Sequence, residues 1–362
     1  MPEAMSNPTS LFEPFALGPV RLRNRIVMAP MTRNRAGEGD APQAINVEYY
    51  RQRASAGLII TEASQVSRQG KGYVHTPGCY SEAQMLGWRK VTDAVHAAGG
   101  KIFLQLWHVG RISHPSFQEG SAQPVAPSAV LPAGQVLTEL GPRPYVTPRP
   151  LGLDEIPAIV AQFRHGAATA QEAGFDGVEL HAANGYLIDQ FLRDGTNLRG
   201  DAYGGSPANR ARLLREIIGA VTEVWNAGQV GVRLSPASGF NDMRDKDPQG
   251  LFEYVAEMLS GYGLAYLHVV EESALPSFNW QAIRRAYRGT YMANGGYDRS
   301  SASTALRDGH ADLVSFGKPF ISNPDLVARL QDDIALTAGD RSSYYGGTER
   351  GYIDYPAIAV PA

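Results

Sequence analysis

The chain contains very little cysteine, since Cys79 is the single thiol among 362 residues. One cysteine excludes an intrachain disulfide and any zinc or iron–sulfur site that needs four cysteine ligands, and we expect no metal. Such a composition is typical of a reducing compartment. The first residues, Met1-Pro2-Glu3-Ala4-Met5, also lack the basic and apolar regions of a signal peptide. The sequence therefore predicts a cytoplasmic protein.

Long apolar runs and an excess of basic charge are also absent. The apolar stretches, of which Gly57-Leu58-Ile59-Ile60 is an example, are much too short to cross a bilayer. The 33 Lys and Arg residues face 36 Asp and Glu residues, which gives a formal net charge of −3, and no basic block stands out. The sequence therefore predicts neither a membrane nor a nucleic acid as partner. It favours a small-molecule ligand, with a monomer or a homodimer as the assembly.

What the chain does have is a regular alternation of short apolar runs and helical patterns. The runs predict eight strands: Arg25–Met31, Gly57–Ala63, Lys101–His108, Gly177–His181, Val230–Ser235, Ala265–Glu271, Thr290–Gly295 and Leu313–Gly317. The spacing near 3.6 predicts helices over Met85–Ala98, Ile156–Ala173, Arg210–Trp225, Leu251–Tyr262, Trp280–Tyr287, Ser300–Arg307 and Pro324–Leu330. Asn323-Pro324 is expected to provide the N-cap and the first-turn proline of the last helix. Eight strands that alternate with helices indicate a single-domain α/β protein, a (β/α)8 TIM barrel, with a doubly wound open sheet as the alternative.

Two stretches do not fit the repeat. Gly110–Pro150, between the third strand and its helix, is long and rich in Pro, Ser and Gly. A loop of that length is usually functional, so we expect a cap over the site, and a solvated insertion is the alternative. The C-terminal tail, residues 340–362, is aromatic and glycine-rich around Tyr344–Pro356. Disordered tails are poor in aromatic residues, so this one is expected to pack on the barrel.

The most informative run is His181 to Phe191, which follows the fourth strand. His181, Asn184 and Tyr186 lie just past the C-terminal end of that strand. In (β/α)8 barrels the active site lies at this end. Two hydrogen-bond donors and a phenol held close together can bind a substrate oxygen through the two donors and supply a proton from the phenol.

A phosphate site is predicted at the ends of the last two strands. Gly295-Gly296 and Gly317 let the backbone approach a ligand closely, and Lys318 adds a positive charge. The loops after strands seven and eight of such barrels commonly bind phosphate with backbone N–H groups.

Arg233 lies inside the apolar fifth strand, where a charge is costly unless it meets an anion. A ligand is one partner, and a buried salt bridge with Glu179 or Glu271 is the alternative. A glycoside hydrolase barrel, with Glu62 and Glu271 as paired carboxylates, is a second chemistry to weigh, although it leaves Arg233 and the glycine pairs without a role.

Together these residues resemble the Old Yellow Enzyme family of FMN-dependent ene-reductases, the NADH:flavin oxidoreductases that include N-ethylmaleimide reductase and xenobiotic reductase types. The resemblance runs from Leu11-Phe12 to Tyr352–Pro356. Its motifs are Met28-Ala29-Pro30-Met31-Thr32-Arg33, Gln105-Leu106-Trp107-His108-Val109-Gly110-Arg111, His181 to Phe191, Asn209-Arg210 and Asn323-Pro324-Asp325-Leu326. The family fold is the same barrel that the periodicity predicts. Some relatives carry a reactive cysteine where Thr32 stands, so Cys79, which lies elsewhere, is interpreted as structural or as a surface thiol.

The resemblance implies a role for each residue of the site. For non-covalent FMN, it implies Thr32 at the flavin O4, backbone contacts from Pro30, Met31 and Ala63, Gln105 and Arg233 at the pyrimidine edge, and Gly295, Gly296, Gly317 and Lys318 at the phosphate. For the substrate, it implies that His181 and Asn184 hold an electron-withdrawing oxygen, that Tyr186 donates a proton, and that Trp107, Tyr73, Phe240 and Tyr345 form walls. The family usually has arginine where Lys318 stands, and lysine loses the bidentate fork of arginine.

The implied reaction uses NADPH or NADH as reductant. Hydride passes to FMN and then to the β-carbon of an activated alkene, such as an α,β-unsaturated carbonyl, a nitroalkene or a maleimide, and Tyr186 protonates the α-carbon. Phenolic ligands are also expected. A nitrate-ester or nitroaromatic reductase with the same flavin site and a flavin-binding protein without turnover are the alternatives.

Overall fold

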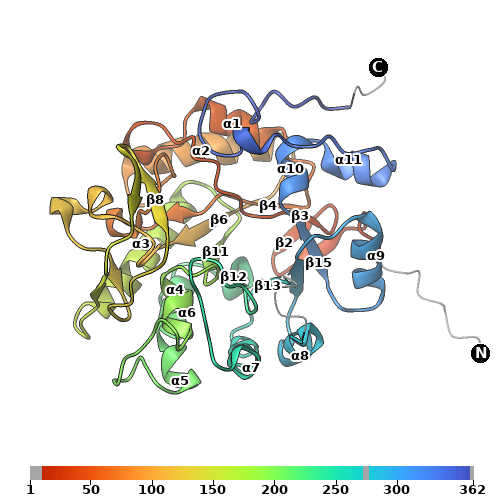
Figure 1. Ribbon diagram of the computed structural model, residues 1–362. Helices are drawn as coiled ribbons and strands as arrows, with labels where there is room; N and C mark the ends of the chain where they lie inside the picture. Colours follow the sequence, from red (N-terminus) through yellow and green to blue (C-terminus); the bar gives the residue numbers. More distant parts are fainter. Residues whose placement is uncertain (1–9, 272–276, 359–362) are drawn as a thin grey trace, which may run out of the picture.

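Eight parallel strands close into a barrel in the computed structural model, which describes residues 10–271 and 277–358. The strands are β3 (Ile26–Met28), β4 (Leu58–Ile60), β6 (Ile102–Trp107), β11 (Gly177–His181), β12 (Val230–Leu234), β13 (Tyr266–Val270), β14 (Tyr291–Asn294) and β15 (Leu313–Phe316). Each pairs with the next, β15 pairs with β3, and β6 pairs with β11. The ring therefore has no open edge (Figure 1), which confirms the predicted barrel and rules out the open sheet.

Helices surround the barrel. Those that follow predicted patterns are α2 (Glu82–Ala97), α3 (Ile156–Glu172), α6 (Arg212–Thr222), α7 (Pro248–Leu259), α8 (Trp280–Ala286), α9 (Arg299–Arg307) and α11 (Leu326–Gln331). Those that the patterns did not predict are α1 (Ala44–Arg51), α4 (Leu187–Leu192), α5 (Pro207–Arg210), α10 (Lys318–Ser322) and the 3-10 turns η1 (Glu38–Asp40), η2 (Arg68–Gly70), η3 (Pro115–Phe117), η4 (Glu119–Ser121), η5 (Ala227–Gln229) and η6 (Arg341–Ser343). None of the helices in the described part of the chain has the length and apolar character needed to cross a bilayer.

The prediction that Asn323-Pro324 begins the last helix is wrong. Asn323 follows the end of α10, and α11 begins only at Leu326, with Asp325 at its N-cap position. The reason is that the side-chain amide of Asn323 forms hydrogen bonds other than those of a helix N-cap. It donates to the Pro319 carbonyl at 2.9 Å and accepts from the Thr337 amide at 2.8 Å, and so ties α10 to the returning chain.

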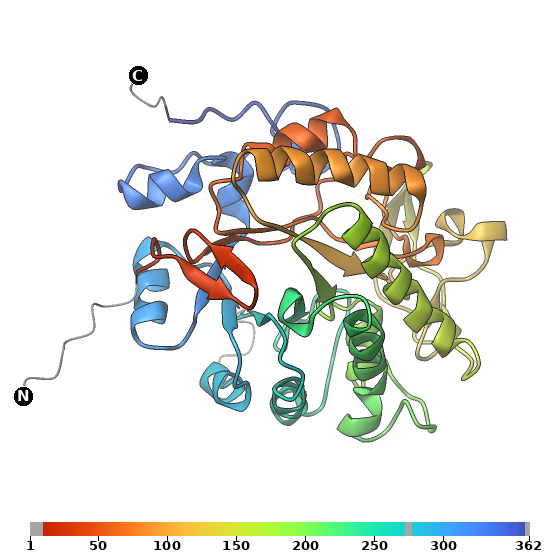
Figure 2. The same ribbon diagram turned by 180° about the vertical axis from the view of Figure 1, so that it is seen from behind.

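The barrel interior has two layers, because successive side chains of a strand alternate between its inside and its outside. The layer nearer the N-terminal ends of the strands is apolar, and a hairpin of β1 (Phe15–Leu17) and β2 (Val20–Leu22) closes it (red in Figure 2). Its members are Leu17, Val20, Leu22, Val27, Leu58, Ile60, Phe103, Ala265, Tyr266, Met292 and Leu313. Two residues further along the strands the inward side chains become polar. They are Gln105, Glu179, Arg233, His268 and Ser315, all buried.

The insertion after β6 has structure of its own (yellow in Figure 1). Besides η3 and η4 it contains β7 (Val125–Ala126), paired in parallel with β10 (Arg149–Pro150), and an antiparallel hairpin of β8 (Gln135–Thr138) and β9 (Gly141–Pro144). A short strand, β5 (Ser64–Gln65), continues the sheet beyond β4 against β6.

The C-terminal tail lies against the barrel as far as residue 358, and residues 359–362 of the predicted tail lie outside the described residues. Tyr352 is fully buried and stacks on Tyr49 of α1, with ring centroids 4.1 Å apart. Arg33, which follows β3, donates to the Tyr344 carbonyl at 2.9 Å and to the Gly351 carbonyl at 2.7 Å. The tail is thus bound to the segment just past the first barrel strand.

Candidate active site

A cavity of about 660 Å³ opens at the C-terminal ends of the strands. It brings together almost all of the residues that the sequence predicted for a site: Pro30, Met31, Thr32, Ala63, Tyr73, Gln105, Trp107, His181, Asn184, Tyr186, Arg233, Phe240, Gly317, Lys318 and Tyr345. Gly295 and Gly296 do not line it. Sequence reasoning missed Ala29, Asn34, Val74, Gln135, Val136, Leu137, Asn294, Ile321, Tyr344 and Gly346. The apolar pair Val136-Leu137 inside the insertion is the one signal that could have pointed to part of this set.

His181 is the last residue of β11 and projects into the cavity, where 5 % of its surface is exposed. Burial, together with the positive charge of Arg233 and the nearby His268, lowers its pKa well below the ordinary value. The ring is therefore neutral at physiological pH. Its Nδ1 atom has no hydrogen-bond partner among the described residues. A neutral imidazole with an open nitrogen is suited to binding a polar atom of a ligand without adding charge.

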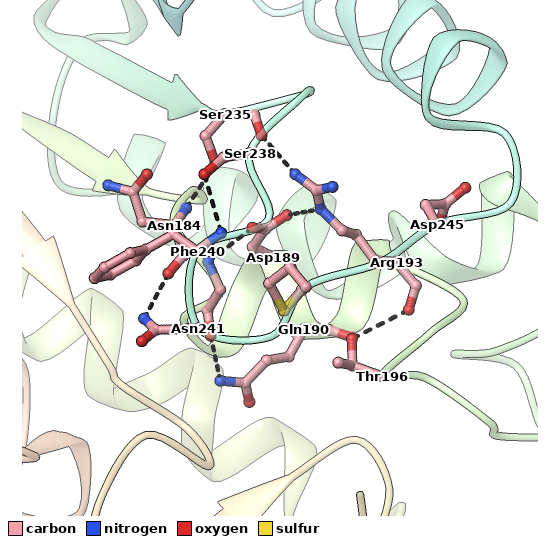
Figure 3. A network of polar contacts seen from close by, with 12 residues as sticks. Asn184, Asp189, Gln190, Arg193, Thr196, Ser235, Ser238, Phe240, Asn241 and Asp245 are labelled. Atoms are coloured by element: carbon pink, nitrogen blue, oxygen red, sulfur yellow. Dashed lines mark hydrogen bonds and ion pairs between the residues drawn. The ribbon is translucent and has the colours of Figure 1, made fainter. Parts of the chain in front are cut away.

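Asn184 is held by backbone contacts to a distant loop (Figure 3). Its φ angle is +57°, a left-handed conformation that asparagine tolerates better than most residues. The Asn184 amide donates to the Ser235 hydroxyl at 2.7 Å, and its carbonyl accepts from the Asn241 side chain at 2.8 Å. Both ends of the residue are thus fixed, and its side chain lines the cavity.

A buried ion pair lies behind this loop. Asp189, which is fully buried, accepts from the Gly185 amide at 2.9 Å and from Arg193 Nε at 2.9 Å. Arg193 also donates to the Ser235 carbonyl (Figure 3). Ser235, which binds the Asn184 amide, is therefore also bound to Arg193 at the end of α4. These contacts join the loop that follows β11 to the loop that follows β12.

Tyr186 stands beside His181, with ring centroids 5.0 Å apart. Its hydroxyl lies 3.2 Å from that of Tyr73. Burial raises the pKa of Tyr186 to about 12, although hydrogen bonds from Tyr73 and Asn241 act in the opposite direction. The phenol is therefore fully protonated at neutral pH and has a proton to give.

The floor of the cavity carries a positive charge. Arg233 Nη1 lies 3.2 Å from His268 Nε2, and Arg233 Nη2 donates to Asn294 Oδ1 at 3.2 Å. Glu271, one of the two partners considered for a salt bridge with Arg233, does not take that role, because it accepts from Tyr291, Tyr297 and His310. Glu179, the other predicted partner, reaches the arginine through His268.

The carboxylate pair of the glycoside hydrolase alternative is not assembled. Neither Glu62 nor Glu271 is among the described residues that line the cavity. Glu62 is buried behind it and accepts from the Arg33 amide at 3.1 Å and from Tyr50 at 3.3 Å, and burial raises its pKa to about 7. Two carboxylates that do not face a common space cannot act on one glycosidic bond.

The predicted phosphate region lies at the ends of β14 and β15. Gly295 has a φ of +146°, and a Cβ atom there would lie 2.3 Å from the Glu271 carbonyl oxygen, so only glycine fits. Gly317 precedes α10, and both it and Lys318 line the cavity. The cavity therefore offers Lys318 in one wall and Arg233 in its floor, and Trp107 Nε1 and His181 Nδ1 lack partners in the part of the chain that the structure describes. This donor set fits an anionic group that also carries polar heterocyclic edges.

Comparisons with known proteins agree with this chemistry. The profile of the NADH:flavin oxidoreductase / NADH oxidase family matches residues 10–337. The chain is 42% identical over 358 residues to 12-oxophytodienoate reductase 1 of Oryza sativa subsp. japonica, covering 96% of this chain and 93% of that protein. Among solved structures, morphinone reductase in complex with tetrahydroNAD is similar at 46% identity with a TM-score of 0.93, covering 98% of each chain. The old yellow enzyme homologue from Zymomonas mobilis is similar at 43% identity with a TM-score of 0.93, covering 96% of this chain and 99% of that one.

Proposed function

Because the chain belongs to the NADH:flavin oxidoreductase / NADH oxidase family, we propose that it reduces the carbon–carbon double bond of activated alkenes. The resemblance to the Old Yellow Enzyme family is confirmed, and with it an FMN-dependent oxidoreductase of ene-reductase type that uses NAD(P)H. The substrate class and the residue roles that follow are our proposal. α,β-Unsaturated carbonyl compounds, nitroalkenes and maleimides are the substrates we expect.

We assign the FMN-binding site to residues at or near the C-terminal ends of six strands. Thr32 would meet the flavin O4, and Gln105 and Arg233 would meet the pyrimidine edge, with backbone contacts from Pro30, Met31 and Ala63. Lys318 and Gly317 of the cavity lining would hold the phosphate, together with Gly295 and Gly296, which follow the lining residue Asn294 in the chain. Bound FMN would supply a hydride, and thus two electrons, which it receives from NADPH or NADH. Arg233 favours negative charge at the edge that it faces.

His181 and Asn184 would polarise the substrate. Both line the cavity, and one is neutral while the other cannot ionise, so each can donate a hydrogen bond to a carbonyl or nitro oxygen. Donation to that oxygen withdraws electrons from the double bond and makes the β-carbon electrophilic. Positioned donors of this kind contribute roughly 10²–10³ in rate, as oxyanion-hole variants indicate.

Tyr186 would give the proton to the α-carbon. The observation that carries this assignment is its placement, since it is edge-on to His181 in the cavity wall and fully protonated. General acid catalysis of this kind is worth about 10²–10⁴ in rate.

The mouth of the cavity favours substrates with an apolar part. Leu137 of β8, Phe240 and Tyr345 of the tail all line the cavity, yet 55%, 58% and 68% of their surfaces are exposed. We assign the insertion and the tail as covers of the site, because both supply side chains to this rim. An apolar substituent of an enone would bury part of these surfaces, which is favourable by about 25 cal/mol per Å².

Reduction of nitrate esters or nitroaromatic compounds is the second candidate. Two adjacent donors, His181 and Asn184, match the two oxygens of a nitro group as well as they match one carbonyl oxygen. This reaction requires the same reduced flavin but no proton from Tyr186 to carbon.

An anaerobic titration tests the proposal. The purified protein is reduced with NADPH, 2-cyclohexenone is added, and the flavin absorbance is followed. Bleaching by NADPH and reoxidation by the enone are expected. Bleaching without reoxidation would favour the nitro compounds. A protein that is colourless after incubation with FMN and removal of the free flavin would refute the FMN-binding site.

A further inference from the structure

One buried carboxylate organises the floor of the cavity. Glu179, in the middle of β11, is fully buried and points into the barrel. Its Oε1 atom accepts from Gln105 Nε2 at 2.7 Å, and its Oε2 atom lies 2.8 Å from His268 Nδ1. Glu179 therefore contacts two side chains from two other strands, Gln105 of β6 and His268 of β13. Gln105 lines the cavity, and His268 contacts Arg233, which also lines it.

The positions of the hydrogens follow from the partners. A carboxylate only accepts, so His268 must carry its proton on Nδ1 and offer a lone pair at Nε2. The Nε2 atom lies 3.2 Å from Arg233 Nη1, which can only donate, and 2.8 Å from the Ser315 hydroxyl. A series of hydrogen bonds thus runs from the carboxylate of Glu179 through the neutral imidazole of His268 to the guanidinium of Arg233.

The same logic fixes Gln105. Its amide nitrogen must face Glu179, because two acceptors would repel each other. Gln105 lines the cavity. One carboxylate therefore sets the orientation of both groups proposed for the pyrimidine edge, Gln105 directly and Arg233 through His268.

Electrostatics supports this arrangement. Burial tends to raise the pKa of Glu179, but His268, Arg233 and Gln105 outweigh it, and the result lies below the ordinary value. Burial and Arg233 lower the pKa of His268 to about 4, although Glu179 acts against them. At neutral pH the group therefore holds one negative charge, one positive charge and a neutral ring, and Glu179 offsets part of the field that Arg233 projects into the cavity.

We propose that Glu179 and His268 are positioning residues that hold Arg233 and Gln105 against the cofactor, and that the negative charge of Glu179 lowers the reduction potential of bound FMN. The inference rests on the proposed function, because it requires FMN in the FMN-binding site described above. Reduction adds negative charge, which Arg233 favours and Glu179 disfavours. Removing the charge of Glu179 therefore raises the potential, and breaking the His268 link loosens the arginine.

The first test removes the charge of Glu179 and, with it, one of its two acceptor oxygens. The midpoint potential of bound FMN is measured by dye equilibration in the wild type, in Glu179→Gln and in the matched control Glu271→Gln. Glu271 is a carboxylate just past β13 that does not line the cavity. Glu179→Gln is expected to shift the reduction equilibrium at least tenfold toward the reduced state, about 30 mV for a two-electron couple, and the control to stay within twofold of the wild type. A loaded Glu179→Gln protein with the wild-type potential would overturn the inference.

The second test breaks the link while keeping the charge. His268→Leu removes both nitrogens, whereas His268→Gln can still donate to Glu179 and accept from Arg233. The FMN dissociation constant, followed by flavin fluorescence, should rise at least tenfold in His268→Leu and return to within threefold of wild type in His268→Gln. Wild-type affinity in His268→Leu would refute the positioning role, and this pair decides the matter if Glu179→Gln does not fold. A wild type that binds no FMN would instead refute the proposed function.

Discussion

The hydroxyl oxygens of Tyr73 and Tyr186 lie 3.2 Å apart in the cavity wall. Both rings are fixed by Trp107, on which Tyr73 stacks at 5.6 Å and against which Tyr186 stands edge-on at 4.9 Å. The pair places a second phenol next to the proposed acid. A hydrogen bond from Tyr73 stabilises the phenolate of Tyr186 and so lowers its pKa.

Replacing Tyr73 with phenylalanine should therefore make Tyr186 a weaker acid. Tyr73→Phe is expected to slow alkene reduction, by less than the roughly 10²–10⁴ attributed to general acid catalysis as a whole. Rapid mixing of the reduced protein with 2-cyclohexenone measures this step. Reduction of the flavin by NADPH, which needs no proton from Tyr186, is the internal control. Equal slowing of both steps would mean that Tyr73 only shapes the cavity.

The pH dependence of alkene reduction should be flat over the neutral range. Tyr186 acts as an acid, so its contribution is present below its pKa of about 12 and is lost only as the pH rises through that value. His181 has a pKa well below its ordinary value and is already neutral. The rate of enone-driven reoxidation between pH 5.5 and pH 9 tests this. A break at about 6.5, the usual imidazole pKa, would show that His181 titrates.

The tail should loosen when Arg35 is removed. Its guanidinium donates to the carbonyls of Thr348 at 3.0 Å, Ser343 at 2.9 Å and Arg350 at 3.3 Å. Arg35→Ala is expected to speed proteolysis within residues 340–358 and to raise the enone KM, because Tyr345 lines the cavity. Limited proteolysis and steady-state kinetics measure the two effects. Arg341→Ala, in the same tail but outside the cavity lining, is the control, and unchanged proteolysis of Arg35→Ala would contradict the assignment.

Asp189→Asn should destabilise the fold. The substitution leaves Arg193 buried without its charged partner, since the exposed fractions of the two side chains are 0% and 3%. Breaking a buried ion pair in this way costs about 3–5 kcal/mol. Denaturant unfolding, monitored by far-UV circular dichroism, measures the loss. A loss below 1 kcal/mol, on the order of a surface ion pair, would show that the pair is not needed to hold the Asn184 loop.

Much of the barrel could be predicted from the sequence, because strand periodicity is local. The strand Gly177–His181 was predicted with its observed bounds, and the other seven strands were predicted somewhat too long. The helix predicted over Arg210–Trp225 is the shorter α6 (Arg212–Thr222), and Arg210 is instead the last residue of the unpredicted α5. The hairpin β8–β9 lacked a clear alternating pattern and was not predicted.

The contacts that fix the site could not be predicted, because they join distant segments. Asn184 depends on Ser235 and Asn241, more than fifty residues away in the chain. The partner of Arg233 is set by strand register, which places His268 opposite Arg233 on β13, whereas Glu271 lies past the end of that strand. Composition and spacing contain no information on register between strands.

The most direct test of the account compares two reactions of one variant. In Tyr186→Phe, alkene reduction by the NADPH-reduced protein should fall by about 10²–10⁴, because the α-carbon loses its proton donor. Reduction of a nitrate ester by the same protein should stay near the wild-type rate, since it needs the reduced flavin but no proton at carbon. The rates of flavin reoxidation by 2-cyclohexenone and by a nitrate ester give the comparison. An equal fall in both would contradict the role of Tyr186 as the proton donor.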